Sequence, residues 1–299
     1  DNTKEGKSYE GEAEKLREQL DGFFSSKEGP EKKPSDHQGE KIKGILAPNY
    51  EPKEAGAIYA WAYKELKEAE TPDVFIVVGT CHTELEHGVA VTDKDFETPL
   101  GVLSVNKPIL DHFRANGGQT FFEEDIRHEQ EHSIEFQLPF IQHAIGSQRS
   151  ITIIPVLCSF PVVTLADAEL KPLFEKIDDF LVAMKASIAA TGQEVCVIGS
   201  ASLAHIGLRY GDNKPPTDFS FHRCMQTDLE MLKKVEEMKP EEFAQFILQE
   251  GDQRHIMGFS TLFLLMKLIN AEKGEVLRYD RAITDQFNST ATYASIAFF

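Results

Sequence analysis

Short apolar runs alternate with amphipathic segments along the chain from residue 41 onward. The runs VFIVV, ITIIPVL and VCVIG are unbroken and rich in β-branched residues, which is typical of strands buried on both faces of a sheet. We expect the last two strands to pair at a sheet edge. The predicted strands are 42–46, 74–78, 88–92, 103–106, 151–157, 195–199, 275–283 and 291–298.

Between these runs the apolar residues recur at helical spacing. Strands that alternate with helices favour right-handed βαβ units, so we expect an α/β fold with a mostly parallel central sheet and helices on both faces. The predicted helices are 55–68, 108–116, 130–144, 166–190, 221–237, 240–250 and 260–270.

The first 40 residues follow a different pattern. Residues 10–24 form an apolar stripe at helical spacing, which predicts an amphipathic helix that packs on the body of the protein. Residues 25–39 are polar and rich in Pro, Gly and Lys, which predicts an exposed loop. The predicted organisation is therefore an N-terminal helix and loop, 1–40, and a single α/β domain, 41–299.

Polar residues follow three of the predicted strands closely. His82 comes after VFIVVGTC, His205 after VCVIGSASLA, and Asn49 after the strand in KIKGILAPNY. In parallel sheets, ligands bind beyond the carboxyl ends of the strands, where the loops splay apart. We therefore expect a functional cleft at this edge. The alternative for each histidine is a hydrogen-bonded core or surface residue.

The segment HEQEHSIEFQLPF is the next dense group of titratable residues. His128 and His132 are one helical turn apart if the segment is helical, but the glutamates do not have the offsets of a metalloprotease HExxH motif, so we reject that hypothesis. His132 is instead a candidate acid–base group or a residue that orients a metal ligand. The alternative is a charged helix start followed by a core face of Ile134, Leu138 and Ile141.

The chain is strongly acidic, with 31 basic and 49 acidic residues and a formal net charge of −18. Such a surface repels phosphate backbones and anionic lipids, so neither nucleic acid nor a membrane surface is expected as a partner. No run of Lys and Arg interrupts this pattern, and no apolar run approaches the length of a membrane span.

The four cysteines are too far apart in sequence for a CxxC metal or redox motif (Cys81, Cys158, Cys196 and Cys224). Three lie in or just after apolar runs, so we expect buried free thiols in a reducing compartment, which favours a cytoplasmic location. A cleaved export signal before Asp1 is the alternative.

Nine segments in order give this chain a specific resemblance to the MEMO family, also called protein B of the AmmeMemoRadiSam system. DFETPLG followed by EHSIEFQLPF is the most specific pair, and the resemblance covers nearly the whole chain. The other segments are YEGEAEKLREQLDGFF, GILAP, WAYKEL, VVGTCHT, IIPVL, SASLAHIGLRYGD and GFSTLFLLMKLI.

The resemblance implies a fold like that of the class III extradiol dioxygenases, which are non-heme iron enzymes that cleave catechol rings. It also implies a cleft that can hold iron or copper, and possible partners among the radical-SAM and companion proteins of the same set. The histidines that the family carries in this cleft are present as His82, His132 and His205.

Three other family positions are changed. The histidine expected after the first strand is Asn49, the aspartate expected before the later histidine is Ser202, and the cysteine expected before a buried helix is Met257. Non-heme iron sites typically use two histidines and one anionic ligand, whereas amide and thioether donors are neutral. We therefore expect the metal positions His82, His205, Asn49 and Met257 to hold no metal, or only weakly bound iron or copper.

Two alternatives keep a metal in the cleft. Cys81 or Cys158 would supply a thiolate from a new direction, or Met257 together with His82 would bind soft Cu(I). The main functional hypothesis is a degenerate metal site that acts in ligand or partner binding. The other hypothesis is an iron- or copper-dependent oxidoreductase, with His132 and His205 as the candidate catalytic residues.

Overall fold

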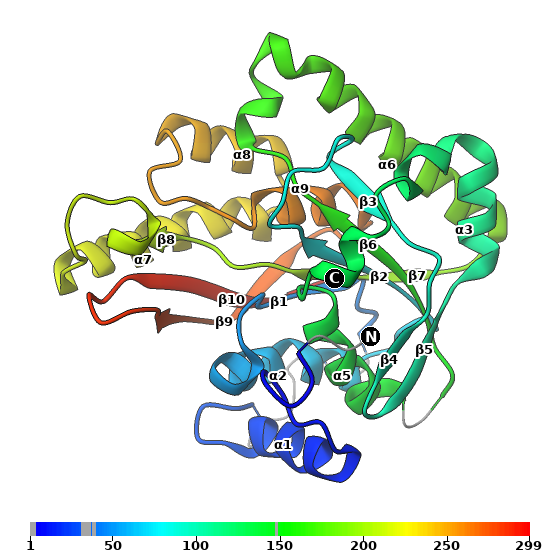
Figure 1. Cartoon of the computed structure of the whole chain (residues 1–299), viewed down its shortest axis with the longest axis horizontal. Helices are drawn as coiled ribbons and strands as arrows, with labels where there is room; N and C mark the ends of the chain where they lie inside the picture. The colour runs from blue at the N-terminus through cyan, green and yellow to red at the C-terminus, as the bar shows by residue number, and fades with distance from the viewer. Residues whose placement is uncertain (1–3, 31–36, 38–39, 147–148) are drawn as a thin grey trace.

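A computed structural model describes residues 4–30, 37, 40–146 and 149–299 of the chain. It confirms the predicted α/β fold, because helices cover both faces of a central sheet (Figure 1). The strands along the sheet follow the order β4-β5-β6-β2-β7-β1-β10-β8, with β3 paired to β6 and β9 paired to β10. Their bounds are β1 Gly44–Ala47, β2 Val74–Thr80, β3 Val89–Val91, β4 Phe96–Thr98, β5 Gly101–Val105, β6 Thr152–Cys158, β7 Val195–Ser200, β8 His205–Ile206, β9 Gly274–Ile283 and β10 Thr290–Phe298.

The centre of the sheet is parallel and its flanks are antiparallel. Strands β5, β6, β2, β7 and β1 run in one direction, as the βαβ pattern predicts. Strands β3, β4, β8, β9 and β10 pair antiparallel with their neighbours, so the sheet as a whole is mixed. The predicted pairing of the last two strands is confirmed, with β9 along the outer side of β10.

The helices divide between the two faces of the sheet. Helices α1, α2 and α5 lie on one side, and α3, α6, α8 and α9 lie on the other (Figure 1). The bounds are α1 Ala13–Ser25, α2 Pro52–Glu68, α3 Lys107–Phe113, α4 Arg127–Gln130, α5 Leu138–Ile141, α6 Lys171–Thr191, α7 Asp218–Glu236, α8 Pro240–Gln249 and α9 Phe259–Leu268.

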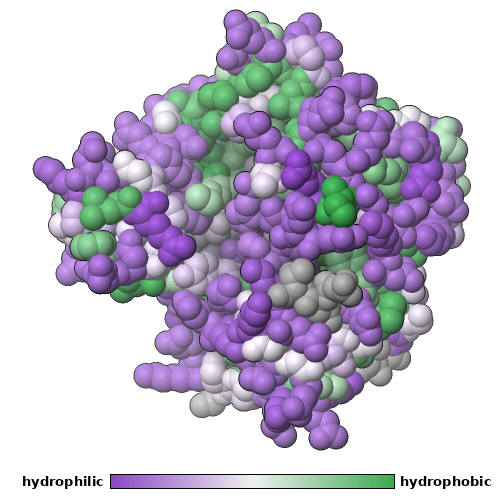
Figure 2. Space-filling model, in the orientation of Figure 1, coloured by the Kyte–Doolittle hydropathy of each residue, from purple (hydrophilic) through white to green (hydrophobic). Residues whose placement is uncertain are grey.

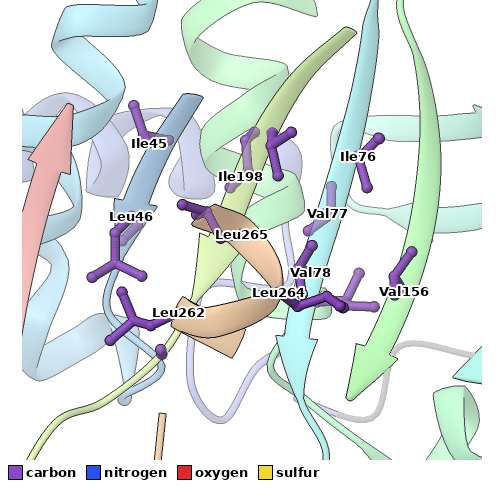
Figure 3. Close-up of a cluster of buried hydrophobic side chains, with 14 of the residues drawn as sticks. Ile45, Leu46, Ile76, Val77, Val78, Val156, Ile198, Leu262, Leu264 and Leu265 are labelled. Carbon is purple, nitrogen blue, oxygen red and sulfur yellow. The ribbon is translucent and has the colours of Figure 1, made fainter. Parts of the chain in front are cut away.

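Helix α9 is buried on nearly all sides, which explains its apolar sequence. Leu262, Leu264 and Leu265 lie against the aliphatic side chains of the parallel strands (Figure 3). Gly199 of β7 leaves room for this contact, since a Cβ there would come within 2.5 Å of the Leu265 side chain. The helix is therefore fixed closely above the strands whose ends carry the predicted cleft.

The N-terminal helix packs on the body, as the stripe of apolar residues predicts. Leu16, Leu20 and Phe24 of α1 are buried, and α1 contacts α2. Tyr9 also donates a 2.7 Å hydrogen bond to the carboxylate of Glu135, in the segment that follows His132. Much of the predicted loop lies outside the described residues.

The predicted helix 130–144 is wrong. The chain is helical in α4, then extended at Glu131, and continues as a 3-10 turn, Glu135–Gln137, before α5. A π-helical turn, Gln142–Gly146, ends the segment. The break at Glu131 means that His128 and His132 do not share one helical face. Pro139 lacks an N–H donor and is accommodated in the first turn of α5.

The described residues form no helix that is long and apolar enough to span a membrane. On the face shown in Figure 2, most of the surface is hydrophilic, and the apolar residues gather mainly in one area in the upper part of the view. All four cysteines are buried and free, as predicted.

Candidate functional site

The candidate site lies where β1 and β2 end, on either side of β7. Both strands are parallel to β7, so Asn49 and His82, which follow them, emerge at the same edge of the sheet. The amide Nδ2 of Asn49 is 3.5 Å from Nε2 of His82. Asn49 is buried, whereas the His82 side chain is 38% exposed, so this contact lies at the boundary between the core and solvent.

The Glu131 carboxylate interacts with the backbone and with the Nδ1 side of the His82 ring. This carboxylate accepts a 2.7 Å hydrogen bond from the His82 backbone N–H and lies 2.8 Å from Nδ1 of the imidazole. Burial alone would raise the pKa of Glu131, but the hydrogen bonds and charge of His82 outweigh it and hold that pKa below its usual range. In the tautomer whose Nδ1 proton points to Glu131, the neutral imidazole presents Nε2 as an acceptor toward the Asn49 amide.

His132 stacks on His82. The ring centroids are 5.0 Å apart and the planes differ by only 14°. Burial, followed by the charge of His82, lowers the pKa of His132 to about 4. The potential ligand atoms of His82, Glu131 and His132 lie within 4.8 Å of one another. At neutral pH this group is an anionic carboxylate with a neutral His132 beside it.

His205 is more buried than His82 and His132. It begins β8, and its backbone N–H donates a 2.7 Å hydrogen bond to the carbonyl of Arg254. Its Nδ1 is 3.1 Å from the Leu203 carbonyl, and its ring meets that of Tyr210 edge-on. Burial lowers the pKa of His205 to about 4, and the charge of His82 adds to this effect. His205 is thus a neutral, buried neighbour of the cluster.

Met257 is a partly exposed residue close to the start of α9. It is 42% exposed and precedes Gly258, from which α9 starts. A Cβ on Gly258 would lie 2.2 Å from the Ser202 carbonyl oxygen, so this turn packs directly on the Ser202 backbone. The structure brings Asn49, His82 and His132 together, but the ring stack and the amide–imidazole contact do not include Met257.

The two cysteines near the strand ends are neutral thiols. Cys81 lies 3.6 Å from a carboxylate oxygen of Glu131, and burial raises its pKa. Burial also raises the pKa of Cys158 to about 12, and its sulfur contacts the hydroxyl of Thr261. Neither environment favours the thiolate that the alternative metal site would need.

A pocket of about 850 Å³ lies between α7, α8 and the loop after β8. It reaches Ile206, the residue after His205, and it includes Arg254 and Glu250, which form an ion pair at 2.8 Å. This pocket adjoins the deep end of the site, but it does not contain the His82 cluster.

The model of the family described as "Memo-like protein" matches residues 2–297. The chain belongs to the Memo-like family. The sequence-based identification of the family is therefore confirmed.

Relatives of this Memo-like chain carry names that state only the family. A MEMO1 family protein of Aquifex aeolicus is 27% identical over 87% of this chain and 64% of the relative. One from Methanopyrus kandleri is 32% identical over 50% of this chain and 53% of its own length. One from Methanobrevibacter smithii is 27% identical over 97% and 96% of the two chains. The match thus spans less than two thirds of the Aquifex and Methanopyrus proteins.

Glu131 is the site residue that the sequence-based prediction missed in this Memo-like chain. The sequence-based prediction places Glu131 in a continuous helix and considers the glutamates of this segment only for an HExxH motif. The available signal was its position directly before His132 in EHSIEFQLPF. Extended backbone at Glu131 lets its carboxylate reach back to His82.

The Memo-like positions that remain do not fit a non-heme iron ion. Such a site needs two imidazoles and a carboxylate around the metal. At Nε2 of His82 the neighbouring group is the neutral amide of Asn49, whereas the carboxylate of Glu131 lies at the opposite ring nitrogen.

Proposed function

We propose that this Memo-like protein binds a small ligand at His82, beside positions where the expected metal ligands of the family are replaced. The supporting observation is the side chain of Asn49. Its Oδ1 atom is buried and has no hydrogen-bond partner among the described residues, although its Nδ2 atom faces His82. An unpaired buried acceptor costs free energy, and a bound donor would remove that cost.

The arrangement favours a ligand that carries hydroxyl or N–H donors. Asn49 Oδ1 is an acceptor without a partner among the described residues. In a neutral His82 with its proton on Nδ1, the Nε2 lone pair faces Asn49 Nδ2 at 3.5 Å, so a ligand donor at Nε2 would replace that long contact. The His132 ring is covered by His82 and Phe136, so the partly exposed His82 ring is the planar group beside these acceptors that an aromatic ligand would contact. Catechol combines two hydroxyl donors with an aromatic ring, in line with the resemblance to extradiol dioxygenases.

A metal-dependent oxidoreductase is the second candidate, supported by the spacing of His82, Glu131 and His132. Two histidines and one carboxylate within 4.8 Å have the composition of a non-heme iron site. This arrangement would require the metal to displace the hydrogen bond between Glu131 and Nδ1 of His82. Because the Glu131 carboxylate is already engaged by the backbone N–H and by Nδ1 of His82, it is not free to bind a metal. Ligand binding is therefore the better-supported function.

Restoring the family's ligands is expected to create a metal site that the wild type lacks. The purified wild type should contain far less than one iron or copper per chain, whereas the double variant Asn49→His/Met257→Cys should bind iron(II) at least roughly tenfold more tightly. Elemental analysis and iron(II) titration measure both quantities. His82→Ala in the double variant is the control and should abolish the gain. A stoichiometric metal in the wild type that disappears in Glu131→Gln would favour the oxidoreductase.

Catechol is the probe for the ligand site, and 1,2-dimethoxybenzene is its matched control without donors. We expect catechol to shift the NMR signals of the His82 ring saturably and the dimethyl ether to leave them unchanged. Asn49→Leu, which removes the acceptor, should weaken catechol binding roughly tenfold. Equal shifts from both compounds, or binding that is unaffected in Asn49→Leu, would show that the acceptor pair is not the site.

A further inference from the structure

A second pocket, of about 540 Å³, lies at the opposite end of the sheet from His82. Residues Arg149–Ile151, just before β6, form part of its wall, whereas His82 follows the carboxyl end of the parallel strand β2. Strands of this length separate the two ends by about 20 Å. Helix α1, the end of α2 and strand β5 complete the wall, so the pocket is independent of the histidine cluster.

Basic side chains from distant parts of the sequence meet in this pocket. Arg17 comes from α1, Lys67 from the end of α2, and Arg149 from the segment before β6. The chain has no run of Lys and Arg, and its formal charge is −18, so a concentration of positive charge is unexpected here. The fold, not the sequence order, brings these cations together.

The carboxylates near the pocket leave part of this charge uncompensated. Arg149 pairs with Asp73 at 3.1 Å, and Asp73 is 67% exposed. Arg17 and Lys67 have no carboxylate partner among the described residues, and the ammonium of Lys67 lies 5.8 Å from the Phe24 ring centre. Like charges that converge in a recess repel one another unless an anion joins them.

His143 lines the same pocket, and the charges of Lys67 and Arg17 affect its pKa. It lies 3.1 Å from a carboxylate oxygen of Asp21, which is 72% exposed. Burial lowers the pKa of His143, and the charges of Lys67 and Arg17 add to this effect while Asp21 opposes it. Lys67 and Arg17 therefore act on the same recess, although they belong to different helices.

We propose that this pocket binds a small phosphate-bearing molecule. Guanidinium and ammonium groups bind phosphate oxygens through charge-assisted hydrogen bonds, and arginine matches their geometry in a bidentate fashion. The volume falls in the range of small-molecule sites, about 300–1,000 Å³. The apolar side chains of Leu100, Leu103 and Ile151 line the same wall and offer contacts to the organic part of the ligand.

The test uses phenyl phosphate as the probe and isothermal titration calorimetry on the full chain at low ionic strength. Phenyl phosphate should bind saturably, whereas phenol should not. The double variant Arg17→Gln/Lys67→Gln should bind roughly a hundredfold more weakly, about tenfold for each lost charged hydrogen bond. Lys15→Gln, on the same helix but outside the pocket, removes one charge and should bind like the wild type.

Two further measurements separate this site from the histidine cluster and from general charge attraction. His82→Ala should leave phenyl phosphate binding unchanged, and benzoate should bind more weakly than phenyl phosphate because it carries one negative charge. Circular dichroism checks that each variant is folded. The proposal is overturned if the folded wild type shows no saturable heat, if the double variant binds normally, or if Lys15→Gln weakens binding equally.

Discussion

Acidification from pH 7 to pH 4.5 is expected to lower the free energy of unfolding of this protein by several kcal/mol. Burial lowers the pKa of four of the described histidines, and for three of them the shift is large enough to keep the ring neutral in the folded chain over most of this range. Burial is the main cause that lowers the pKa values of His128, His132 and His205, each to about 4. In the unfolded chain these groups titrate near the ordinary histidine value of about 6.5.

The direction of this change in stability depends on whether the folded or the unfolded chain binds more protons. Between pH 6.5 and pH 4 the unfolded chain binds more protons than the folded chain, so stability falls as the pH falls. The stabilisation by these neutral histidines is fully present above their pKa in the unfolded chain. It is lost progressively as the pH falls toward their pKa in the folded chain. Each pKa unit corresponds to about 1.4 kcal/mol, so each histidine contributes on the order of 3 kcal/mol. Burial raises the pKa values of Asp228 and Asp252, and these carboxyls offset part of the loss.

His128 provides the sharpest variant for this prediction. Its Nε2 lies 3.2 Å from the Ala90 carbonyl, and its Nδ1 is buried without a hydrogen-bond partner among the described residues. Protonation would therefore place a second N–H in a site with no acceptor. His128→Gln can retain a donor to Ala90 and does not titrate, so urea unfolding at pH 7.0, 5.5 and 4.5 should show a weaker pH dependence than in the wild type.

His222 is the matched control, because it is an exposed histidine on α7. His222→Asn should leave the pH dependence of the unfolding free energy unchanged. A wild type whose unfolding free energy is the same at pH 7.0 and pH 5.5 would contradict the prediction. So would a His128→Gln variant with the full wild-type dependence.

The sequence was most informative where a simple geometric rule applied. Unbroken apolar runs predict the parallel strands, and the rule that sites follow their carboxyl ends places Asn49 and His82 at one edge of the sheet. The short strands β4 and β8 were not predicted, since segments of two or three residues carry almost no periodicity.

Long-range contacts were less predictable. Helical spacing in residues 130–144 suggested one helix, but the extended backbone at Glu131 depends on its bonds to His82, 49 residues away in the sequence. The pocket lined by Arg17, Lys67 and Arg149 is equally hard to predict, because these residues lie in three separate segments of the sequence. A single sequence does not show which distant side chains a fold brings together.

The buried ion pair of Asp228 and Arg254 is the contact whose loss should destabilise the fold most. Asp228 is fully buried on α7 and pairs with the guanidinium of Arg254, which is 7% exposed. Its other carboxylate oxygen accepts hydrogen bonds of 2.7 Å from Tyr279 and 2.6 Å from Thr292. One carboxylate thus joins α7, β9 and β10 to the segment before α9.

Asp228→Ala is expected to lower the free energy of unfolding by about 3–5 kcal/mol. Among the described residues, the variant leaves the buried Arg254 charge with Glu250 as its one anionic partner. It also leaves the hydroxyls of Tyr279 and Thr292 without their acceptor. Chemical denaturation at pH 7 measures the loss. Glu241→Gln is the control, because it removes the exposed pair with Lys267 and should change stability by less than about 1 kcal/mol.

The same ion pair connects stability to the candidate site. The backbone carbonyl of Arg254 accepts the hydrogen bond from the N–H of His205, so displacement of Arg254 should move the start of β8. Asp228→Asn keeps the side-chain volume and one carbonyl acceptor, and it should lose less stability than Asp228→Ala while still shifting the NMR signals of His205. If Asp228→Ala costs no more than Glu241→Gln, the buried pair does not hold these elements together. If His205 is unperturbed in both Asp228 variants, its position is fixed by the Leu203 carbonyl and the Tyr210 ring instead.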